Sequence, residues 1–291
     1  MRTTTKSKMA KSKIRIGLGK LGSRLLSNLS AEKKEVFDIR DAEAASGLKG
    51  LRLGKLLHNL VKNRWVERIE RGRYLILSLE SGLGAGYGID SYTMARKLVI
   101  PYYIGFFSAL EYYGITEQVS RTMFIVTIKR KRALRFHAQD YYFVTFPKKR
   151  FFGATEEWIG QFKFKISDLE KTLVDCLFMP EYSGGITEVI KAFRRKLDYE
   201  KLYEYALKMD NLATIKRLGY VLDALKIKTP ITKKLLKKVG GGYCLLDTGG
   251  PKTQRIQFSK TGLHQDLSKI KYNKKWRVIE NIPKEELMVE L

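Results

Sequence analysis

The sequence predicts an α+β protein built from an N-terminal winged helix-turn-helix and a larger mixed α+β domain. Three observations lead to this fold class. The chain has 291 residues, which is at the upper edge of what one hydrophobic core usually spans and favours two domains. Its first 80 residues follow the order helix, strand, helix, helix, hairpin. The remaining residues mix aromatic-rich helical segments with short β-prone runs, so two separate architectures share the chain.

Composition also indicates where the parts begin and end. The first residues are Lys, Ser and Thr with little to bury, which is typical of a disordered basic arm. Four glycines at alternate positions near residue 85 indicate a flexible linker. We therefore expect an arm, a winged helix-turn-helix, a linker and an α+β domain at residues 1–15, 16–80, 81–90 and 91–291.

The charge of the chain indicates a polyanionic partner. Lys and Arg number 56 against 30 Asp and Glu, a net charge of +26. A heat-adapted surface rich in Lys and Glu would balance the two signs, and these signs do not balance. Residues 1–80 hold 19 of the basic residues and 8 of the acidic ones, so the N-terminal part is the more positive per residue. Nucleic acid is the partner that this charge predicts.

The first elements follow from apolar spacing and capping residues. Leucines at helical spacing predict a helix over Leu18–Leu29, and a β-prone run predicts a short strand over Val36–Ile39. We expect Asp41 to cap a brief helix through Ala45, which ends at Gly47.

The next helix, Gly50 to Asn63, is amphipathic. Its apolar stripe is Leu53, Leu56, Leu57 and Leu60. The opposite face is polar, as insertion into a DNA major groove requires. In this helix and directly before it, the residues that we expect to contact DNA are Lys49, Arg52, Lys55, Asn59 and Lys62.

Two β-prone runs, Trp65–Glu70 and Arg73–Leu79, flank Arg71 and Gly72 and predict a hairpin. This hairpin would be the wing, with Arg71 and Arg73 on DNA phosphates. A solvated basic face on a small helical bundle explains the same periodicity. Gly17–Gly22 also matches the pattern G-x-G-x-x-G of a dinucleotide site, but alternating strands and helices do not follow it.

The second part begins with an aromatic-rich segment that predicts a helix over Tyr102–Tyr113. Strands are predicted at Met123–Ile128 and Tyr141–Phe146. The loop between them is basic, and it includes Arg135. It is either a solvated turn or a secondary phosphate contact through Lys129, Arg130, Lys131 and Arg132.

A strand over Gln161–Ile166 leads into Ser167-x-x-Glu170, a capping box for a helix through Phe178. The acidic residues of this helix, together with Lys171, suggest a nuclease. Glu170 and Lys171 are, however, adjacent in the first turn of the helix, where capping explains the presence of an acidic residue. Further helices are predicted over Ile186–Leu197, Leu202–Met209 and Leu212–Leu225, and strands near Tyr243–Leu246, Ile256–Phe258 and Trp276–Ile279.

Cysteines and histidines provide no pattern for a metal or cofactor. The two cysteines, Cys176 and Cys244, are far apart, and the three histidines lie at no metal-ligand spacing. Lys20 and Arg24 interrupt the only apolar N-terminal stretch, which excludes a signal peptide. The longest uncharged run, Leu98–Leu110, is too short to span a bilayer. We expect a cytoplasmic protein without cofactor, metal or membrane contact.

Several blocks carry a family resemblance, and they occur in one order along the chain. They are Pro101–Leu110, Tyr113–Gln118, Asp168–Cys176, Gly184–Val189 and Arg217–Tyr220. Together they resemble the AbiEi-type antitoxins of type IV toxin-antitoxin systems, first known from phage abortive infection. The resemblance covers residues 20–225 and leaves the N-terminal arm and the tail after Asn281 outside.

The resemblance implies a transcriptional repressor that binds inverted repeats of double-stranded DNA in its own promoter. Two copies of the chain could bind such repeats as a homodimer. It also implies that the second domain counteracts a nucleotidyltransferase-like toxin. None of the blocks combines a nucleophile, a base and an oxyanion donor, so we expect no enzyme. Two alternatives stay open: a metal-dependent nucleic-acid enzyme targeted by a winged helix, and a winged-helix regulator unrelated to toxins.

Overall fold

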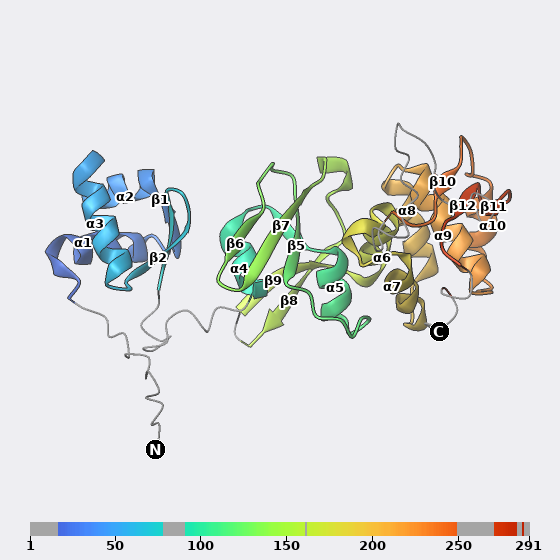
Figure 1. Ribbon diagram of the computed structural model, residues 1–291, viewed down its shortest axis with the longest axis horizontal. Helices are drawn as coiled ribbons and strands as arrows, with labels where there is room; N and C mark the ends of the chain where they lie inside the picture. The colour runs from blue at the N-terminus through green and yellow to red at the C-terminus, as the bar shows by residue number, and fades with distance from the viewer. Residues whose placement is uncertain (1–16, 78–90, 161, 249–270, 284–286, 288–291) are drawn as a thin grey trace, which may run out of the picture. The chain divides into compact units, whose positions relative to one another are not determined.

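The structure is a computed structural model that describes residues 17–77, 91–160, 162–248, 271–283 and 287. The chain divides into two compact units, Met1–Asp90 and Ser91–Leu291. Both units combine helices with a sheet, so the protein is a mixed α+β protein (Figure 1). The arm expected at residues 1–15 and the linker expected at residues 81–90 lie outside the described residues.

The first unit follows the order of elements that the sequence predicted. Its described residues form α1 (Gly19–Ala31), β1 (Val36–Asp38), α2 (Ile39–Ser46), α3 (Gly50–Lys62), β2 (Val66–Glu70) and β3 (Arg73–Ile76). The strands form one antiparallel sheet in the order β1-β3-β2. The strand that follows α1 therefore pairs with the far strand of the hairpin and closes the unit.

The core of the first unit uses one face of each helix. Leu53, Leu57 and Leu60 of α3 are at most 2% exposed. They pack in one cluster with Leu25 and Leu29 of α1. Leu56, predicted as part of the same stripe, is only partly buried at the border of the cluster. Burial of this stripe commits one side of α3 to the core and leaves its other side exposed.

The prediction that Asp41 caps the second helix is wrong by three residues. Asp38, the last residue of β1, is the N-cap of α2, and its Oδ1 accepts a hydrogen bond from the Asp41 N–H at 2.9 Å. Asp41 Oδ2 accepts in return from the Asp38 N–H at 3.0 Å, which completes a capping box. The helix thus starts directly from the strand, and Gly47 ends it in a left-handed conformation, as predicted.

The second unit starts with a six-stranded sheet and two helices that pack on it. The elements are α4 (Ser91–Leu98), β4 (Tyr102–Ile104), α5 (Phe106–Tyr112), β5 (Thr122–Thr127), β6 (Leu134–Phe136), β7 (Gln139–Thr145), β8 (Ala154–Ile159) and β9 (Phe162–Ser167). The strand order is β6-β7-β5-β4-β9-β8. Pairs β4–β9 and β5–β7 are parallel, and the other neighbours are antiparallel.

The helix predicted over Tyr102–Tyr113 is wrong in its first part. Tyr102–Ile104 is the central strand β4, with all three residues buried. Only Phe106–Tyr112 is helical. A strand covered on both faces is apolar at every position, so it has no period that distinguishes it from a buried helix.

Other differences concern short elements. Arg135 lies in β6, within the segment predicted as a loop, and the edge strand β8 was not predicted. Helices α4 and α10 (Ile231–Leu236) were not predicted either. The helix expected over Ile186–Leu197 is shorter, because α7 (Ile186–Lys191) passes into a 3-10 turn at Ala192–Arg194.

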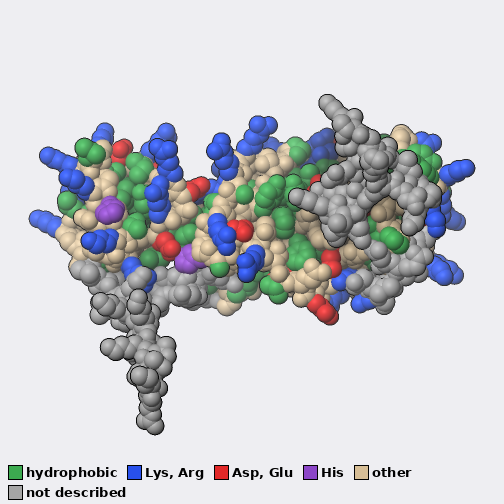
Figure 2. All heavy atoms as spheres, in the orientation of Figure 1, with side chains coloured by type: hydrophobic (Ala, Val, Ile, Leu, Met, Phe, Trp, Pro, Cys, Tyr) green, Lys and Arg blue, Asp and Glu red, His purple; other side chains and the backbone are tan. Residues whose placement is uncertain are grey.

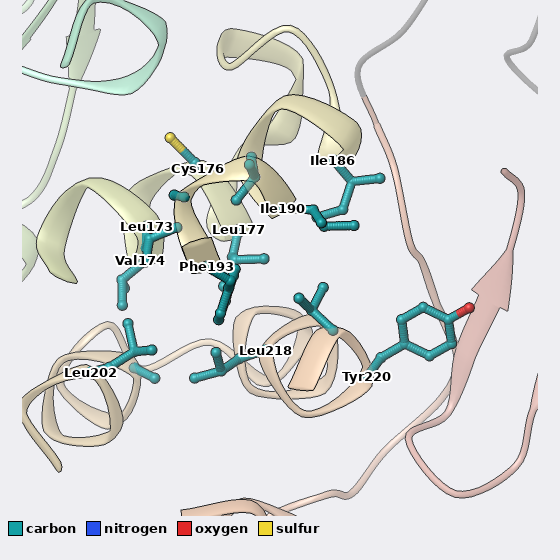
Figure 3. Packing of buried hydrophobic residues seen from close by; sticks show 14 of the residues in the cluster. Leu173, Val174, Cys176, Leu177, Ile186, Ile190, Phe193, Leu202, Leu218 and Tyr220 are labelled. Carbon is teal, nitrogen blue, oxygen red and sulfur yellow. The ribbon is translucent and has the colours of Figure 1, made fainter. Parts of the chain in front are cut away.

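Helices form the remaining core of the second unit. They are α6 (Leu169–Phe178), α7, α8 (Tyr199–Lys208), α9 (Leu212–Ala224) and α10. Figure 3 shows Leu173 and Leu177 of α6 pointing toward Leu202 of α8 and Leu218 of α9. These four leucines are fully buried, so α6 is the central helix of this layer.

A small second sheet ends the described chain. It consists of β10 (Cys244–Leu245), β11 (Lys271–Asn273) and β12 (Val278–Glu280), in the order β10-β12-β11. The strands predicted near Tyr243–Leu246 and Trp276–Ile279 correspond to β10 and β12, while Ile256–Phe258 lies outside the described residues. Within the described ranges, every helix is too short or too polar to cross a membrane.

Candidate nucleic-acid interface

The turn before α3 fixes the direction of that helix. Asn28 Nδ2 donates a hydrogen bond to the Ala45 carbonyl at 2.8 Å and ties α1 to the end of α2. Ser46 Oγ accepts from the Leu48 N–H at 3.1 Å within the turn. Gly50 starts α3 with a φ of +57°, a conformation that glycine adopts without strain. The angle between α2 and α3 is thus set by local hydrogen bonds and by the leucine core.

The exposed face of α3 carries the side chains that the sequence predicted to contact DNA. Arg52, Lys55, Asn59 and Lys62 are all exposed, and Lys49 is exposed at the N-cap. Helix α3 contains no Asp or Glu. Among the described residues, none of its three cations forms an ion pair. This face therefore presents uncompensated positive charge beside a carboxamide.

The spacing of these residues suits contact with base edges. Positions 52, 55, 59 and 62 follow one another by three or four residues, so they share one side of the helix. An α-helix fits the major groove of B-DNA. Arginine can donate two hydrogen bonds to guanine, and asparagine can pair in the same way with adenine. The arrangement has the chemistry for both phosphate and base contacts.

Three exposed residues of α3 were missed in the sequence. Leu51 is 86% exposed, although leucine is usually buried. His58 is also exposed, and an added Cβ at Gly54 would meet no atom within 4 Å. Leu51 lies in the first turn of the helix, off the predicted apolar stripe, and that position was the available signal.

The two arginines predicted to contact DNA from the β2–β3 hairpin differ in exposure. Arg71 is exposed beside Gly72, whose φ of +76° forms the tight turn. Arg73 is half-buried, and its Nη1 lies 3.3 Å from Glu70 Oε1. Arg71 is consequently the more accessible cation at this tip.

The secondary basic loop lies between β5 and β6 in the second unit. Lys129, Arg130 and Arg132 are exposed there. Lys131 is half-buried, with its Nζ 5.4 Å from the centroid of the Phe143 ring. Three of the four cations named for this loop are thus exposed, and the fourth lies against an aromatic ring.

A buried polar network at α6 involves the residues that suggested a nuclease. Lys171 Nζ lies 2.5 Å from Asp175 Oδ1, and both side chains are fully buried. Tyr103 of β4 donates its hydroxyl hydrogen to Asp175 Oδ2 at 2.9 Å. Burial raises the pKa of the Asp175 carboxyl and lowers the pKa of the Lys171 ammonium. Their mutual contact is what allows two such groups to lie in the interior.

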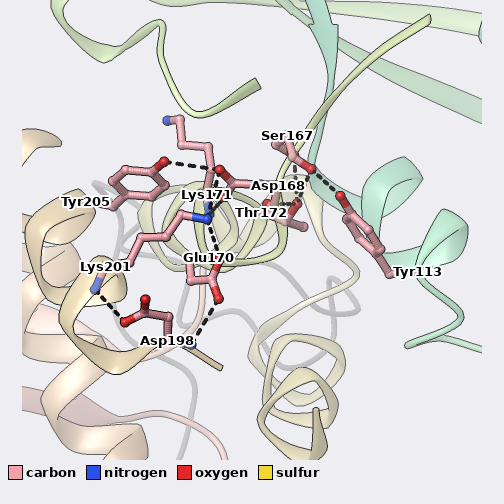
Figure 4. Close-up of polar contacts among 9 residues, drawn as sticks. All are labelled: Tyr113, Ser167, Asp168, Glu170, Lys171, Thr172, Asp198, Lys201 and Tyr205. Carbon is pink, nitrogen blue, oxygen red and sulfur yellow. Dashed lines mark hydrogen bonds and ion pairs between the residues drawn. The ribbon is translucent and has the colours of Figure 1, made fainter. Parts of the chain in front are cut away.

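The remaining acids of α6 tie it to α8 (Figure 4). Glu170 accepts hydrogen bonds from Lys201 Nζ at 2.9 Å and from the Asp198 N–H at 3.0 Å. Burial would raise the pKa of Glu170, but these hydrogen bonds outweigh it and hold the pKa below its ordinary value. Asp168 accepts from the Tyr205 hydroxyl at 3.1 Å. These carboxylates hold two helices together.

The capping box predicted at Ser167 and Glu170 is wrong. Asp168 is the N-cap of α6, and its Oδ1 accepts from the Lys171 N–H at 2.8 Å. Ser167 Oγ instead lies 2.7 Å from Thr172 Oγ1, while Glu170 binds Lys201. A serine directly before an aspartate leaves the start of a helix ambiguous by one residue, and the aspartate took the cap here.

The described residues contain no group of three or more His, Cys, Asp or Glu side chains placed to hold a metal ion. The surface instead is dominated by cations. Figure 2 shows Lys and Arg side chains well in excess of Asp and Glu side chains on the face in view. Positive charge is therefore the main feature of this face, and such charge attracts anions.

Comparison with known proteins gives a similarity in fold. No family model matches the chain, and no curated protein matches it. Among solved structures, the crystal structure of the RV2827C protein from Mycobacterium tuberculosis is similar, with a TM-score of 0.57 and 12% sequence identity. The similarity covers 96% of this chain and 97% of that chain. The two proteins thus share a fold over nearly their whole lengths.

Proposed function

We propose that this protein is a DNA-binding transcriptional autorepressor that also acts as an antitoxin. In this proposal residues 17–77 form a winged helix-turn-helix, α3 is the recognition helix, and the β2–β3 hairpin is the wing. The observation that carries it is the exposed face of α3, where Arg52, Lys55 and Lys62 have no acidic neighbour on the helix. Such a face attracts DNA phosphates and can reach base edges.

The antitoxin role rests on the resemblance to AbiEi-type antitoxins. The blocks of that resemblance lie mostly in β4, α5, α6 and α9, whose side chains build the core of the second unit. Asp168, Glu170, Lys171 and Asp175 are engaged with one another or with α8, which favours a structural role for them over a nuclease. The second unit would counteract a nucleotidyltransferase-like toxin, and two copies of the chain would bind inverted repeats.

A two-readout experiment in cells tests the proposal. A reporter fused to the promoter of the chain's own operon measures repression, and growth during co-expression of the neighbouring gene product measures antitoxin activity. The Arg52→Ala/Lys55→Ala variant should lose repression and keep full rescue of growth. A matched control, Lys20→Ala/Arg24→Ala, removes two exposed cations from α1 and should keep both activities.

Each outcome has a distinct meaning. Repression by the α3 variant equal to wild type would remove α3 from DNA recognition. A neighbouring gene product without toxicity would leave a winged-helix regulator unrelated to toxins. Rescue that disappears together with repression would place neutralisation in transcriptional control.

A further inference from the structure

The small C-terminal sheet is anchored firmly on α9. Trp276, in the turn between β11 and β12, is fully buried, and its Nε1 donates to Asp223 Oδ2 at 2.6 Å. Gly219 of α9 makes room for this indole, because an added Cβ would lie 2.1 Å from Trp276 Cζ3. Val278 of β12 is also fully buried in the same core. The inner face of the sheet is therefore fixed.

The outer face of this sheet is partly aromatic. Leu245 pairs with Ile279, and Ile279 pairs with Tyr272, so these three side chains share one face. Tyr243 lies two residues before Leu245. The rings of Tyr243 and Tyr272 are 5.4 Å apart and nearly perpendicular, and they are 45% and 57% exposed. Neither hydroxyl has a hydrogen-bond partner among the described residues.

The exposed charge of the segments that form this sheet and the preceding helix has one sign. In residues 226–248 and 271–283 every Lys and Arg is exposed, while the two acidic side chains, Asp247 and Glu280, are 5% and 8% exposed. Lys234 pairs with Glu200, and Lys275 pairs with Asp223. Within the described residues, the others have no carboxylate partner. They are Lys226, Lys228, Lys233, Lys237, Lys238, Lys271, Lys274 and Arg277.

Two cations brace the glycine turn that precedes Tyr243. Arg277 Nη1 donates to the Gly241 carbonyl at 2.5 Å, and Lys216 Nζ donates to the Gly242 carbonyl. These contacts hold positive charge and an exposed ring next to each other. We name Tyr243, Tyr272 and the eight cations without a carboxylate partner the C-terminal basic surface.

We propose that the C-terminal basic surface binds single-stranded RNA. Exposed aromatic rings stack on unpaired bases, and surrounding Lys and Arg side chains follow the phosphate backbone. A duplex conceals its base faces, so the two tyrosines would contribute nothing to it. RNA is the nucleic acid that presents unpaired bases in its loops and ends. This surface shares no residue with α3 and is independent of the repressor function.

The test measures binding of the full chain to a fluorescently labelled oligouridylate of about 12 nucleotides by fluorescence anisotropy. Tyr243→Ala/Tyr272→Ala should weaken binding at least about tenfold, because stacking contributes about fivefold or more for each base and the variant removes two rings. Tyr243→Phe/Tyr272→Phe keeps both ring faces and should bind within about threefold of wild type. Arg52→Ala/Lys55→Ala should bind the RNA like wild type.

A second variant changes charge at the surface, so its effect on RNA binding does not depend on the packing of the two tyrosines. Lys237→Glu/Lys238→Glu changes two exposed side chains and should weaken RNA binding and reduce its dependence on salt. The proposal is overturned if the tyrosine-to-alanine variant binds RNA like wild type while it remains folded by circular dichroism. It is also overturned if random duplex DNA, or single-stranded DNA of the same length, binds this surface more tightly than the RNA.

Discussion

Removing one member of the Lys171–Asp175 pair should strongly destabilise the second unit. Lys171→Met leaves the fully buried Asp175 carboxylate with the Tyr103 hydroxyl as its hydrogen-bond donor. Breaking a buried pair in this way lowers the free energy of unfolding by about 3–5 kcal/mol. The double variant Lys171→Met/Asp175→Leu removes both charges. Its loss should fall to about 1–3 kcal/mol, because only the tyrosine hydroxyl is left without a partner.

Urea unfolding followed by tryptophan fluorescence measures this difference. The chain has three tryptophans, and a Trp65→Phe background leaves Trp158 and Trp276, which both lie in the second unit. The signal then reports that unit alone. A single variant that loses less than about 1 kcal/mol, or a double variant less stable than either single variant, would refute the account of this pair.

The same variant should show a characteristic pH dependence. Burial raises the pKa of Asp175, and the Lys171 ammonium opposes that rise, so Lys171→Met should raise the pKa further. A carboxyl whose pKa is raised in the folded state stabilises the fold below its ordinary pKa and loses that contribution as pH rises through the raised value. The stability gap between wild type and Lys171→Met should therefore be smallest in acid and grow toward neutral pH. A constant gap would contradict this reasoning.

Four further variants test packing and DNA contact. Leu51→Ala should leave stability unchanged and weaken promoter binding by about 1 kcal/mol, because a contact with a thymine methyl group is lost. On promoter DNA with deoxyuridine in place of thymidine, the variant and wild type should bind alike. A difference in affinity that persists on that DNA would exclude the contact. Arg71→Ala should lower the slope of log affinity against log salt by about 1. Arg73→Ala should lower it less, because Glu70 holds that guanidinium, and the reverse order would contradict the hairpin contacts. Gly219→Ala should destabilise the second unit by about 1–3 kcal/mol in urea unfolding, because the added Cβ would overlap Trp276. A Gly219→Ala variant as stable as wild type would refute that packing.

The first unit was predictable because its helices are amphipathic. Leu53, Leu57 and Leu60 recur at helical spacing, and their burial follows directly from that period. Pairing of β1 with β3 was not predictable, because nothing local in Val36–Asp38 specifies which strand it joins. Local periodicity was thus enough to predict the elements of this unit, whereas the order of its strands could be seen only in the structure.

The second unit was harder because its central elements are buried on every side. Tyr102–Ile104 has no polar position that would reveal a strand. The edge strand β8 alternates half-buried and exposed residues, but Glu156 and Glu157 interrupt its apolar pattern. Even so, the i, i+4 spacing of Lys171 and Asp175 was visible in the sequence, whereas their complete burial was not.

The candidate interface was partly predictable for the same physical reason. Arg52, Lys55 and Asn59 are exposed because they lie opposite a leucine stripe that the sequence displays. The exposure of Leu51 and the pairing of Arg73 with Glu70 depend on where the helix starts and how the hairpin turns. Those features are set by backbone geometry at Gly50 and Gly72, which residue types alone do not specify.

Binding of the full chain to its own promoter DNA tests the central claim most directly. Fluorescence anisotropy would compare a labelled promoter duplex with a scrambled duplex at one salt concentration. Arg52→Ala/Lys55→Ala should lose about 2–6 kcal/mol on the promoter and bind both duplexes alike, whereas Lys20→Ala/Arg24→Ala should keep the preference of wild type. If the α3 variant still preferred the promoter as strongly as wild type does, α3 would not be the element that reads DNA.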